Sequence, residues 1–228
     1  IKEANFNGKG IALNTNLTFS PQSVSGGLNF SIPNYNYSDK SLDGNISRTD
    51  TDNLKNNGYK NKLSNISLGT SFEQRQNFYF SPSLSFQYET IETDLSASAE
   101  IKKQSGNYYD LNLDYGLYYD KRNQRFKPSS GFSSNFVQRI PLISNNYTFK
   151  NSYSFNQYKE ISDEMIGSLR LYVQSINSLS NNKNVRVSER LQVPANRLRG
   201  FKSGNVGPID GQTFLGGNYL TALNLGTS

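Results

Sequence analysis

The chain has 228 residues, a formal net charge of +6, and neither cysteine nor histidine. Without these two residue types it has no disulfide framework, no thiolate or imidazole zinc site and no Ser-His-Asp relay, which excludes most hydrolytic chemistry. Only 34% of the residues are hydrophobic, yet 13% are aromatic. This combination argues against disorder and fits either a membrane β-barrel or a tyrosine-rich soluble β-sandwich.

The basic residues are scattered along the chain, with Lys102-Lys103 and Lys121-Arg122 as the densest positions. A scattered excess is typical of solvated loops, so we expect no nucleic-acid partner. No run approaches the roughly 20 apolar residues of a membrane helix. No signal peptide is visible within the sequence and Ile1 is not a start residue, so we expect the chain to be a piece of a longer precursor.

Alternation of apolar and polar residues with a period of two is the dominant signal, and it predicts strands. It is clearest over residues 109–119, where the odd positions are tyrosine or leucine and Asp110, Asn112 and Asp114 lie between them. Most predicted strands reach the ~9–11 residues that cross a bilayer. In chain order they are 9–20, 23–34, 41–52, 58–73, 76–91, 107–120, 130–141, 146–159, 164–177 and 217–226.

These strands predict an all-β fold, a transmembrane antiparallel β-barrel in which neighbours in sequence pair. The odd residues of 109–119 are expected to face lipid, and the polar residues between them the lumen. Connections 73–75 and 143–145 look short, whereas 92–106 and 178–216 are long and polar. Short turns on one rim and long loops on the other are typical of bacterial barrels, and we expect that division here.

Two connections contain motifs. Between the strands at 107–120 and 130–141, proline and glycine predict a turn, and the residues of this turn motif are Asp120, Asn123, Phe126, Pro128 and Gly131. In the long loop 178–216, glycine permits a tight turn, arginine offers a planar fork that suits a carboxylate, and phenylalanine supplies an apolar anchor. The residues of this signature loop are Leu198, Arg199, Gly200, Phe201, Gly207 and Pro208, and Gly216, Gly217 and Asn218 open the next strand.

These motifs, together with the turn at 5–10, resemble the BamA-type barrel of bacterial outer-membrane protein assembly factors and its wider translocator superfamily. The resemblance implies an incomplete fragment with about ten strands of a sixteen-stranded barrel. The fragment would run from the end of the second strand to the twelfth. The first strand, the last four strands and the periplasmic repeat domains would lie outside the chain, which leaves exposed edges near 9–20 and 217–226.

The resemblance also implies a function that is not enzymatic. An integral outer-membrane protein of this kind folds and inserts β-barrel proteins without ATP, and we expect no cofactor and no metal. The implied partners are unfolded outer-membrane protein clients, outer-membrane lipids and the accessory lipoproteins of the assembly complex.

In the family, the signature arginine folds into the lumen and pairs with an acid on a nearby strand, so we expect Arg199 to anchor the loop in this way. The sequence departs from the family at two places. Pro194-Ala195 stands where the family has Gly-Gly, and Gly226 stands where a carboxylate is expected. Asp210 is the only acid after Phe201, so the partner of Arg199 lies beyond Ser228 or differs in this protein.

Three alternatives remain open from the sequence. The first is a secretion pore of the same superfamily that exports a partner protein through its lumen. The second is a soluble or porin-like β protein without an assembly role. The third is an enzyme such as an outer-membrane hydrolase, which is the least favoured because no nucleophile–base set is present.

Overall fold

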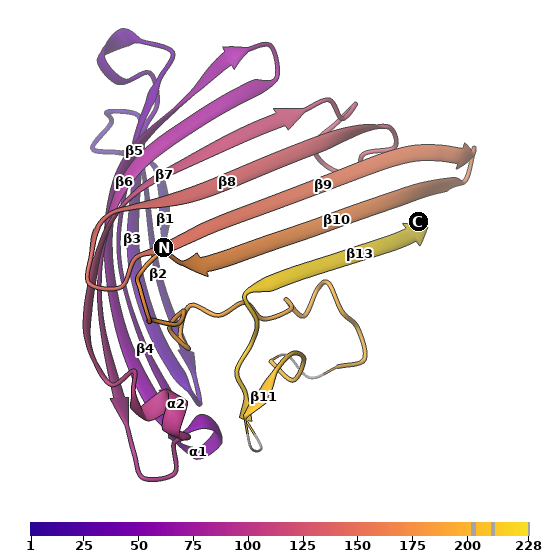
Figure 1. Cartoon of the computed structure of the whole chain (residues 1–228). Coiled ribbons are helices and arrows are strands. Elements are labelled where there is room, and N and C mark those ends of the chain that lie inside the picture. The colour runs from indigo at the N-terminus through magenta and orange to yellow at the C-terminus, as the bar shows by residue number, and fades with distance from the viewer. Residues whose placement is uncertain (202–203, 211–212, 228) are drawn as a thin grey trace.

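The computed structural model describes residues 1–201, 204–210 and 213–227, and its main feature is one curved antiparallel sheet of eleven strands (Figure 1). The strands pair in sequence order, as predicted, and the sheet stays open, with β1 and β13 at its two edges. The strands are β1 (Lys2–Phe6), β2 (Ile11–Ser20), β3 (Ser23–Ile32), β4 (Ser41–Asn53), β5 (Tyr59–Arg75), β6 (Phe78–Thr93), β7 (Gly106–Asp120), β8 (Gly131–Ser144), β9 (Thr148–Ser162), β10 (Met165–Ser178) and β13 (Tyr219–Thr227).

The remaining elements are short. They are α1 (Leu54–Asn57), α2 (Ala99–Lys102), a 3-10 turn at Tyr35–Tyr37, and a small hairpin of β11 (Ile209–Asp210) and β12 (Thr213–Phe214) within the long loop. No helix in the described part of the chain has the length and apolar character needed to cross a membrane. The prediction missed the hairpin because its strands are too short to show a period of two.

The predicted strands are confirmed, with one correction at the N-terminal edge. The edge strand is β1, which pairs with the first residues of β2 from Ile11 to Asn14, and not the predicted strand 9–20 itself. The expected turn follows β1, and its residues Asn7, Gly8 and Gly10 have positive φ angles. β1 escaped prediction because it is five residues long. The C-terminal edge is β13, as expected.

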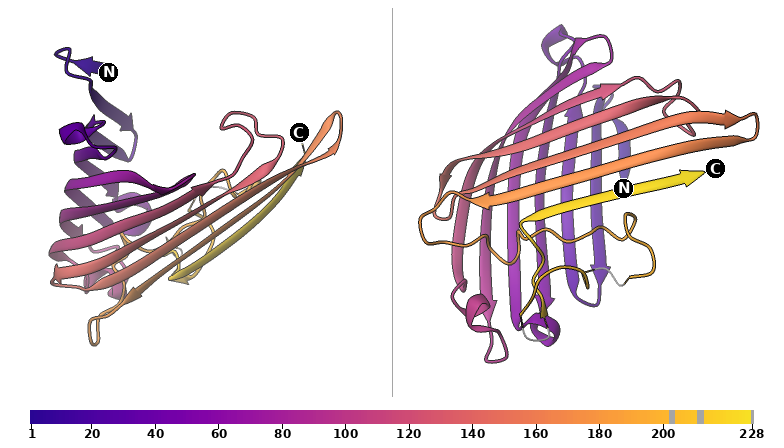
Figure 2. Two further views of the ribbon diagram at one scale, coloured as in Figure 1. Left: turned by 90° about the horizontal axis from the view of Figure 1, so that it is seen from above. Right: turned by 45° about the vertical axis from the view of Figure 1, so that its right-hand side comes forward.

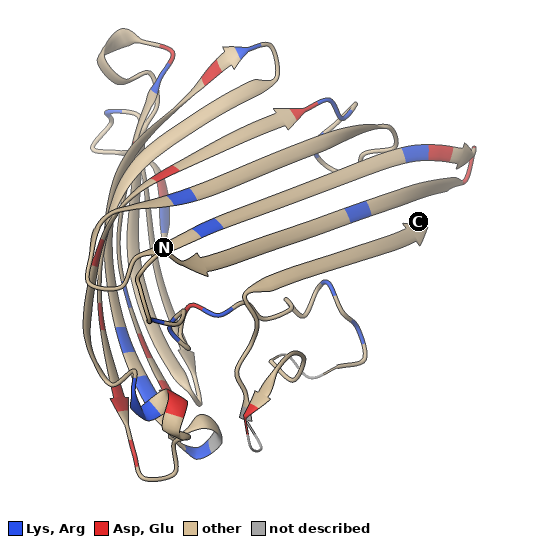
Figure 3. Cartoon of the chain, viewed as in Figure 1, with Lys and Arg blue, Asp and Glu red and all other residues tan. Residues whose placement is uncertain are grey.

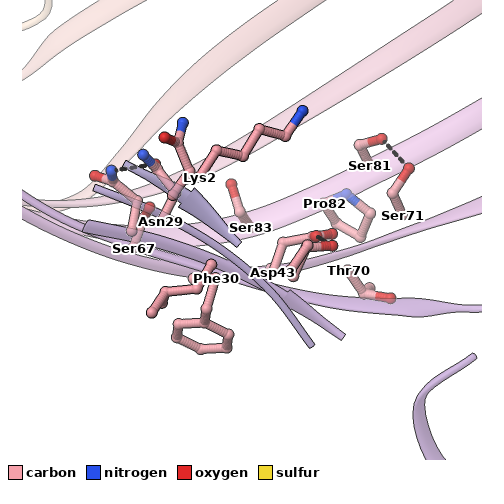
Figure 4. Close-up of a pocket in the computed structure, with 17 residues that line it drawn as sticks. Lys2, Asn29, Phe30, Asp43, Ser67, Thr70, Ser71, Ser81, Pro82 and Ser83 are labelled. Carbon is pink, nitrogen blue, oxygen red and sulfur yellow. Dashed lines mark hydrogen bonds between the residues drawn. The ribbon is translucent and has the colours of Figure 1, made fainter. Parts of the chain in front are cut away.

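The two faces of the sheet differ in chemistry. Across β3 to β6, Leu28, Ile46, Ile66 and Phe86 pair in register and form an exposed apolar row. The residues next to this apolar row in each strand point to the opposite face and form a polar row. It consists of Asn29, Asn45, Ser67, Ser85 and, on β7, Asn112. Figure 4 shows part of this polar face, where Asn45 donates to Asn29 (2.6 Å) and Ser71 bonds to Ser81 (2.8 Å).

The predicted orientation of residues 109–119 is confirmed. Tyr109 is 46% exposed on the apolar face, whereas Asp110 and Asn112 are 4% and 2% exposed. Asp114 accepts a hydrogen bond from Arg139 (2.7 Å), which also donates to Gln87. The sheet curves around this polar face (Figure 2), which we call the inner face.

The expected division between short turns and long loops is wrong. Because consecutive strands are antiparallel, the connections 21–22, 54–58, 94–105, 145–147 and 179–218 share one rim, the loop rim, and the connections 7–10, 33–40, 76–77, 121–130 and 163–164 share the other, the turn rim. The short turn after β8 therefore lies beside the two longest loops. The predicted turn at 73–75 belongs to β5, and the chain reverses at Asn77, which has a φ of 65°.

The two faces predict different responses to the same substitution. In the full-length protein in lipid vesicles, Ile66→Arg should lower the free energy of unfolding by about 2–4 kcal/mol, because it places a charge near the middle of the lipid face. Ser67→Arg, one residue away, should have a much smaller effect, because Ser67 lines an open inner-face cavity of about 480 Å³. Urea titration of both variants tests this, and equal losses would contradict the assignment of the faces.

Candidate functional site: a buried arginine that anchors the inward loop

The connection 179–218 leaves β10 at the loop rim, lies against the inner face of the sheet and returns to β13 (Figures 1 and 2). Its first part is held to the β8–β9 turn, where Lys183 donates to the carbonyl of Asn145 (2.6 Å) and Asn146 donates to the carbonyl of Asn184 (3.3 Å). We call this connection the inward loop. Its position on the polar face explains why the carboxylates there are buried and not hydrated.

Arg186 is the centre of the contact between the inward loop and the wall. Its side chain is 3% exposed. Its Nη2 donates to Oδ2 of Asp110 on β7 (2.6 Å), and its Nε donates to Oε2 of Glu189 (3.0 Å) and lies 3.4 Å from Oε2 of Glu89 on β6. The guanidinium also lies over the ring of Tyr108, 4.8 Å from its centroid. One residue of the loop thus joins two strands that are distant from it in sequence.

Each of the three carboxylates also accepts a hydrogen bond from a strand residue, which fixes its position. Ser144 of β8 donates to Oδ1 of Asp110. Asn61 of β5 donates to Oε1 of Glu89 (3.2 Å), and Thr148 of β9 donates to Oε1 of Glu189 (3.2 Å). The cluster therefore involves five consecutive strands, β5 to β9. It is prearranged to receive one cation at a defined place on the inner face.

The electrostatics of the cluster favour a permanently charged Arg186. Burial by itself would lower the pKa of a guanidinium, but the carboxylates of Glu189 and Asp110 outweigh it and hold the pKa of Arg186 above its usual range. One guanidinium faces three carboxylates. Loss of Arg186 would leave these buried carboxylates without their cation. Removing one partner of a buried ion pair is strongly destabilising, because the remaining charge is buried and unpaired.

Apolar contacts flank Arg186 on both sides. Val185 is 2% exposed and packs with Ile176, Leu191 and Leu220, near the ends of β10 and β13. Val187 packs into the second cluster, whose other members are Tyr59, Ile91, Ala97, Ile101 and Leu215. The backbone N–H of Val187 also donates to the side chain of Gln104 (2.7 Å). Val185 and Val187 are therefore buried in separate apolar clusters, with the arginine between them. A turn begins at Arg186, whose carbonyl accepts from the backbone N–H groups of Glu189 and Arg190 (3.0 and 3.2 Å).

The predicted signature residues lie further along the inward loop. Arg199 and Gly200 are exposed, Phe201 is 62% exposed and Leu198 is partly buried. Within the described residues Arg199 forms no ion pair, and the contact with the wall is made by Arg197, which lies over the ring of Tyr172 (5.0 Å). The pairing of Arg199 with a carboxylate, either beyond Ser228 or at a different position in this protein, stays a prediction. Gly207 and Pro208 lead into the β11–β12 hairpin, where Leu215 donates to the carbonyl of Pro208 (2.9 Å).

The strand-opening motif connects the loop to the sheet. Gly216 has a φ of +76°, and a Cβ there would lie 2.7 Å from the carbonyl oxygen of Leu191, so only glycine fits. Gly217 and Leu191 exchange two backbone hydrogen bonds (2.8 and 2.9 Å). Asn218 accepts from the backbone N–H of Ile176 (2.8 Å). The motif thus secures the end of the inward loop whose beginning Arg186 secures.

The predicted turn motif forms the β7–β8 connection on the opposite rim, far from Arg186 in the fold. Asp120 accepts two hydrogen bonds from the guanidinium of Arg122 (2.9 and 2.8 Å). Gly131 has a φ of +90°, and a Cβ there would lie 2.1 Å from the carbonyl oxygen of Lys121. Asn123 supports the turn through its side chain, Pro128 is partly buried, and Phe126 is 80% exposed.

The fold, with an apolar outer face and a loop folded against the inner one, is that of a transmembrane β-barrel wall. The chain matches the model of the Omp85 superfamily domain over residues 5–225 and belongs to that superfamily of outer-membrane β-barrel assembly and translocation proteins. No curated protein matches it in sequence. Among solved structures it is similar to BamA from Haemophilus ducreyi lacking POTRA domains 1-3, with a TM-score of 0.83 and 21% identity. The match covers 98% of this chain and 48% of that one, so the chain spans about half of its length.

The Arg186 cluster was missed by reasoning from the sequence. Arg186 follows an asparagine-rich stretch that looks like solvated loop. The available signal was the pair Val185 and Val187 on either side of it, because valine is one of the residue types most often buried. A second signal was the presence of two acids, Glu89 and Asp110, at inner-face positions of neighbouring strands, because such acids require a cation when covered.

The cluster predicts a large effect for Arg186→Met in the full-length protein. Methionine keeps the apolar packing but leaves the carboxylates without a cation. The inward loop should therefore become sensitive to protease, and the free energy of unfolding should fall by about 3–5 kcal/mol. Arg186→Lys should restore part of the loss, because an ammonium lacks the fork that reaches Asp110 and Glu189 together.

The matched control is Lys103→Met, which removes an exposed ion pair with Glu100 (3.0 Å) on the loop rim. Surface pairs of this kind contribute about 0–1 kcal/mol. Limited proteolysis and urea titration of the three variants measure the difference. If Arg186→Met matches Lys103→Met in both assays, the anchoring role is wrong.

Proposed function

We propose that this chain is the barrel wall of an outer-membrane assembly factor, which folds and inserts β-barrel proteins without ATP. Membership of the Omp85 superfamily supports an assembly or translocation role in the outer membrane. The observation that favours assembly is the inward loop, which a buried arginine and two apolar clusters hold against the inner face. A lumen occupied by a fixed loop suits a protein that works at its wall better than one that passes a polypeptide through its centre.

The energy for insertion comes from the client. An unfolded barrel strand in or near lipid has backbone donors and acceptors that cost several kcal/mol each when unpaired. Pairing those groups along a strand edge, and moving the client's apolar residues into lipid, are both favourable. The assembly factor lowers the barrier between these states and makes no covalent bond. We include unfolded outer-membrane proteins, outer-membrane lipids and accessory lipoproteins as the partners of this function.

The residues of this chain contribute a stable wall. Its apolar outer row faces the lipid, and its inner-face polar groups are bonded to one another and to the inward loop. Arg186 is a positioning residue in this scheme, because it acts by fixing the loop. The exposed Arg199-Gly200-Phe201 segment lies outside the anchored part of the loop, where it is accessible to the rest of the full-length protein.

A reversible tether distinguishes assembly from export. The side chain of Asn146 lies within 3.3 Å of the backbone of Asn184, so the pair Asn146→Cys and Asn184→Cys is suited to fixing the loop to the wall by a disulfide. With the full-length protein in vesicles, folding of an added barrel client should proceed without ATP, and it should be similar with the tether oxidised and reduced. Heat-resistant mobility of the client on gels measures its folding.

Export through the lumen requires the inward loop to move, so a secretion pore would lose activity on oxidation and regain it on reduction. Failure of the vesicles to fold any client while they release a partner protein would overturn the proposal in favour of export. Each single-cysteine variant under the same oxidant is the control for damage that does not depend on the tether.

The family signature gives a separate prediction for Arg199. In the full-length protein, Arg199→Ala should increase proteolysis of the loop near residue 200 and slow client folding, because the carboxylate expected to pair with Arg199 in the lumen would lose its partner. Arg199→Lys should rescue only in part, since lysine lacks the bidentate fork. Wild-type behaviour of Arg199→Ala in both assays would leave Arg186 as the arginine on which the loop depends.

A further inference from the structure

The β7–β8 connection on the turn rim has a surface that the inward loop and the wall do not use. The connection begins next to the last members of a group of aromatic rings on the outer face. The ring of Tyr119 lies 6.3 Å from that of Phe78 and 5.7 Å from that of Phe132, which in turn lies 5.8 Å from Phe155. Aromatic side chains of membrane proteins gather at the level of the lipid headgroups. The connection therefore emerges at the membrane–water interface.

The connection is held in one conformation by its own polar groups. The side-chain oxygen of Asn123 accepts hydrogen bonds from the backbone N–H groups of Gln124, Ser129 and Ser130 (3.0, 3.2 and 3.3 Å). Gln124 donates to the carbonyl of Lys127 (2.7 Å). A side chain at the end of this connection is thus presented with little loss of conformational freedom on binding.

The exposed side chains at its end are basic or aromatic. Lys121, Arg125 and Lys127 are exposed, and Phe126 between them is 80% exposed. Lys121 also lies over the ring of Tyr119 (5.8 Å), so its charge is close to the outer face of the barrel. Figure 3 shows the basic segments gathered in this connection after the acidic end of β7. We call these four residues the basic tip.

Acidic residues do not cancel this charge. Asp120 is engaged by both donors of Arg122 and by the hydroxyl of Tyr118 (2.8 Å). The pKa of Arg122 is raised by its hydrogen bonds with Asp120, so the pair stays ionised and internally neutral. On the next turn of the same rim, Asp163 and Glu164 limit the patch to the β7–β8 connection.

We propose that the basic tip is a binding site for anionic phospholipid headgroups, in which Phe126 enters the interface and the three cations contact phosphate. An exposed aromatic residue beside cations is the chemistry that binds an anionic membrane surface. The position at the end of the aromatic group places those cations at headgroup level on the turn rim. The inference rests on the membrane location in the proposed function and adds a lipid preference at one named place.

The test uses the full-length protein with Phe126→Cys carrying a polarity-sensitive fluorophore, and with any other cysteine replaced by serine. It is reconstituted in vesicles of phosphatidylcholine alone or with phosphatidylglycerol. We expect the emission to shift to shorter wavelength as phosphatidylglycerol is added. Replacing Lys121, Arg125 and Lys127 by glutamine should weaken this dependence by roughly fivefold for each cation removed.

The matched control replaces Lys55, Lys102 and Lys103, which are exposed on the loop rim, by glutamine, and it should leave the response of the label unchanged. Inorganic phosphate is added as a competitor. If phosphate alone reverses the shift, the site binds a free anion and the lipid assignment is overturned. If the label responds only to an added acidic protein, the occupant is a protein and the proposal fails.

A second label, at Ile66→Cys, separates the two levels of inference, because Ile66 lies in the outer apolar row. If the label at 66 is quenched by a brominated lipid and the label at 126 does not respond to phosphatidylglycerol, only the lipid site is overturned. A label at 66 that is quenched by a water-soluble quencher and not by a brominated lipid overturns the membrane location and therefore the proposed function itself.

Discussion

A buried guanidinium needs buried carboxylates, and this requirement determines where the inward loop lies. Arg186 has its side chain 3% exposed and meets acids from β6, β7 and its own loop. Any other position of the loop would leave Glu89 and Asp110 either hydrated or unpaired. The hydrophobic clusters on either side provide most of the buried apolar area, but apolar contacts have little directional preference. The ion cluster supplies the direction, because a fork of N–H donors fits its acceptors in one orientation only.

The sheet itself was predictable because it depends on a local pattern. Period-two alternation over residues 109–119 identified β7 and assigned Asp110, Asn112 and Asp114 to the inner face, which the structure confirms. Strand pairing followed from sequence order, since antiparallel neighbours joined by short connections are the simplest arrangement. β1 was missed because five residues hold too little of the pattern. The rim assignment failed because connection length is not determined by which side of the sheet a connection occupies.

The inward loop was only partly predictable, since its position depends on contacts between residues far apart in sequence. Arg186 and Asp110 are 76 positions apart, and no local pattern links them. The Arg-Gly-Phe segment drew attention because its composition is distinctive, yet in this structure it is exposed, and Arg197 makes the contact with Tyr172. The strand-opening glycines were easier to identify. Gly216 has both a positive φ and a backbone oxygen at the position of its missing Cβ, two constraints that exclude every other residue.

Both rims of the wall use the same physical device, a polar side chain that satisfies several groups at once. At the loop rim Arg186 joins Asp110 and Glu189, and at the turn rim Asn123 accepts from three backbone N–H groups. In each case the polar side chain belongs to a connection, the inward loop or the β7–β8 connection, and not to a strand. Because a strand separates its two faces at every second residue, the inner chemistry and the lipid-facing surface are free to change separately. The wall therefore combines an exposed apolar row on its outer face with local polar anchors, and it is these anchors, not the strands, that determine how the connections are held.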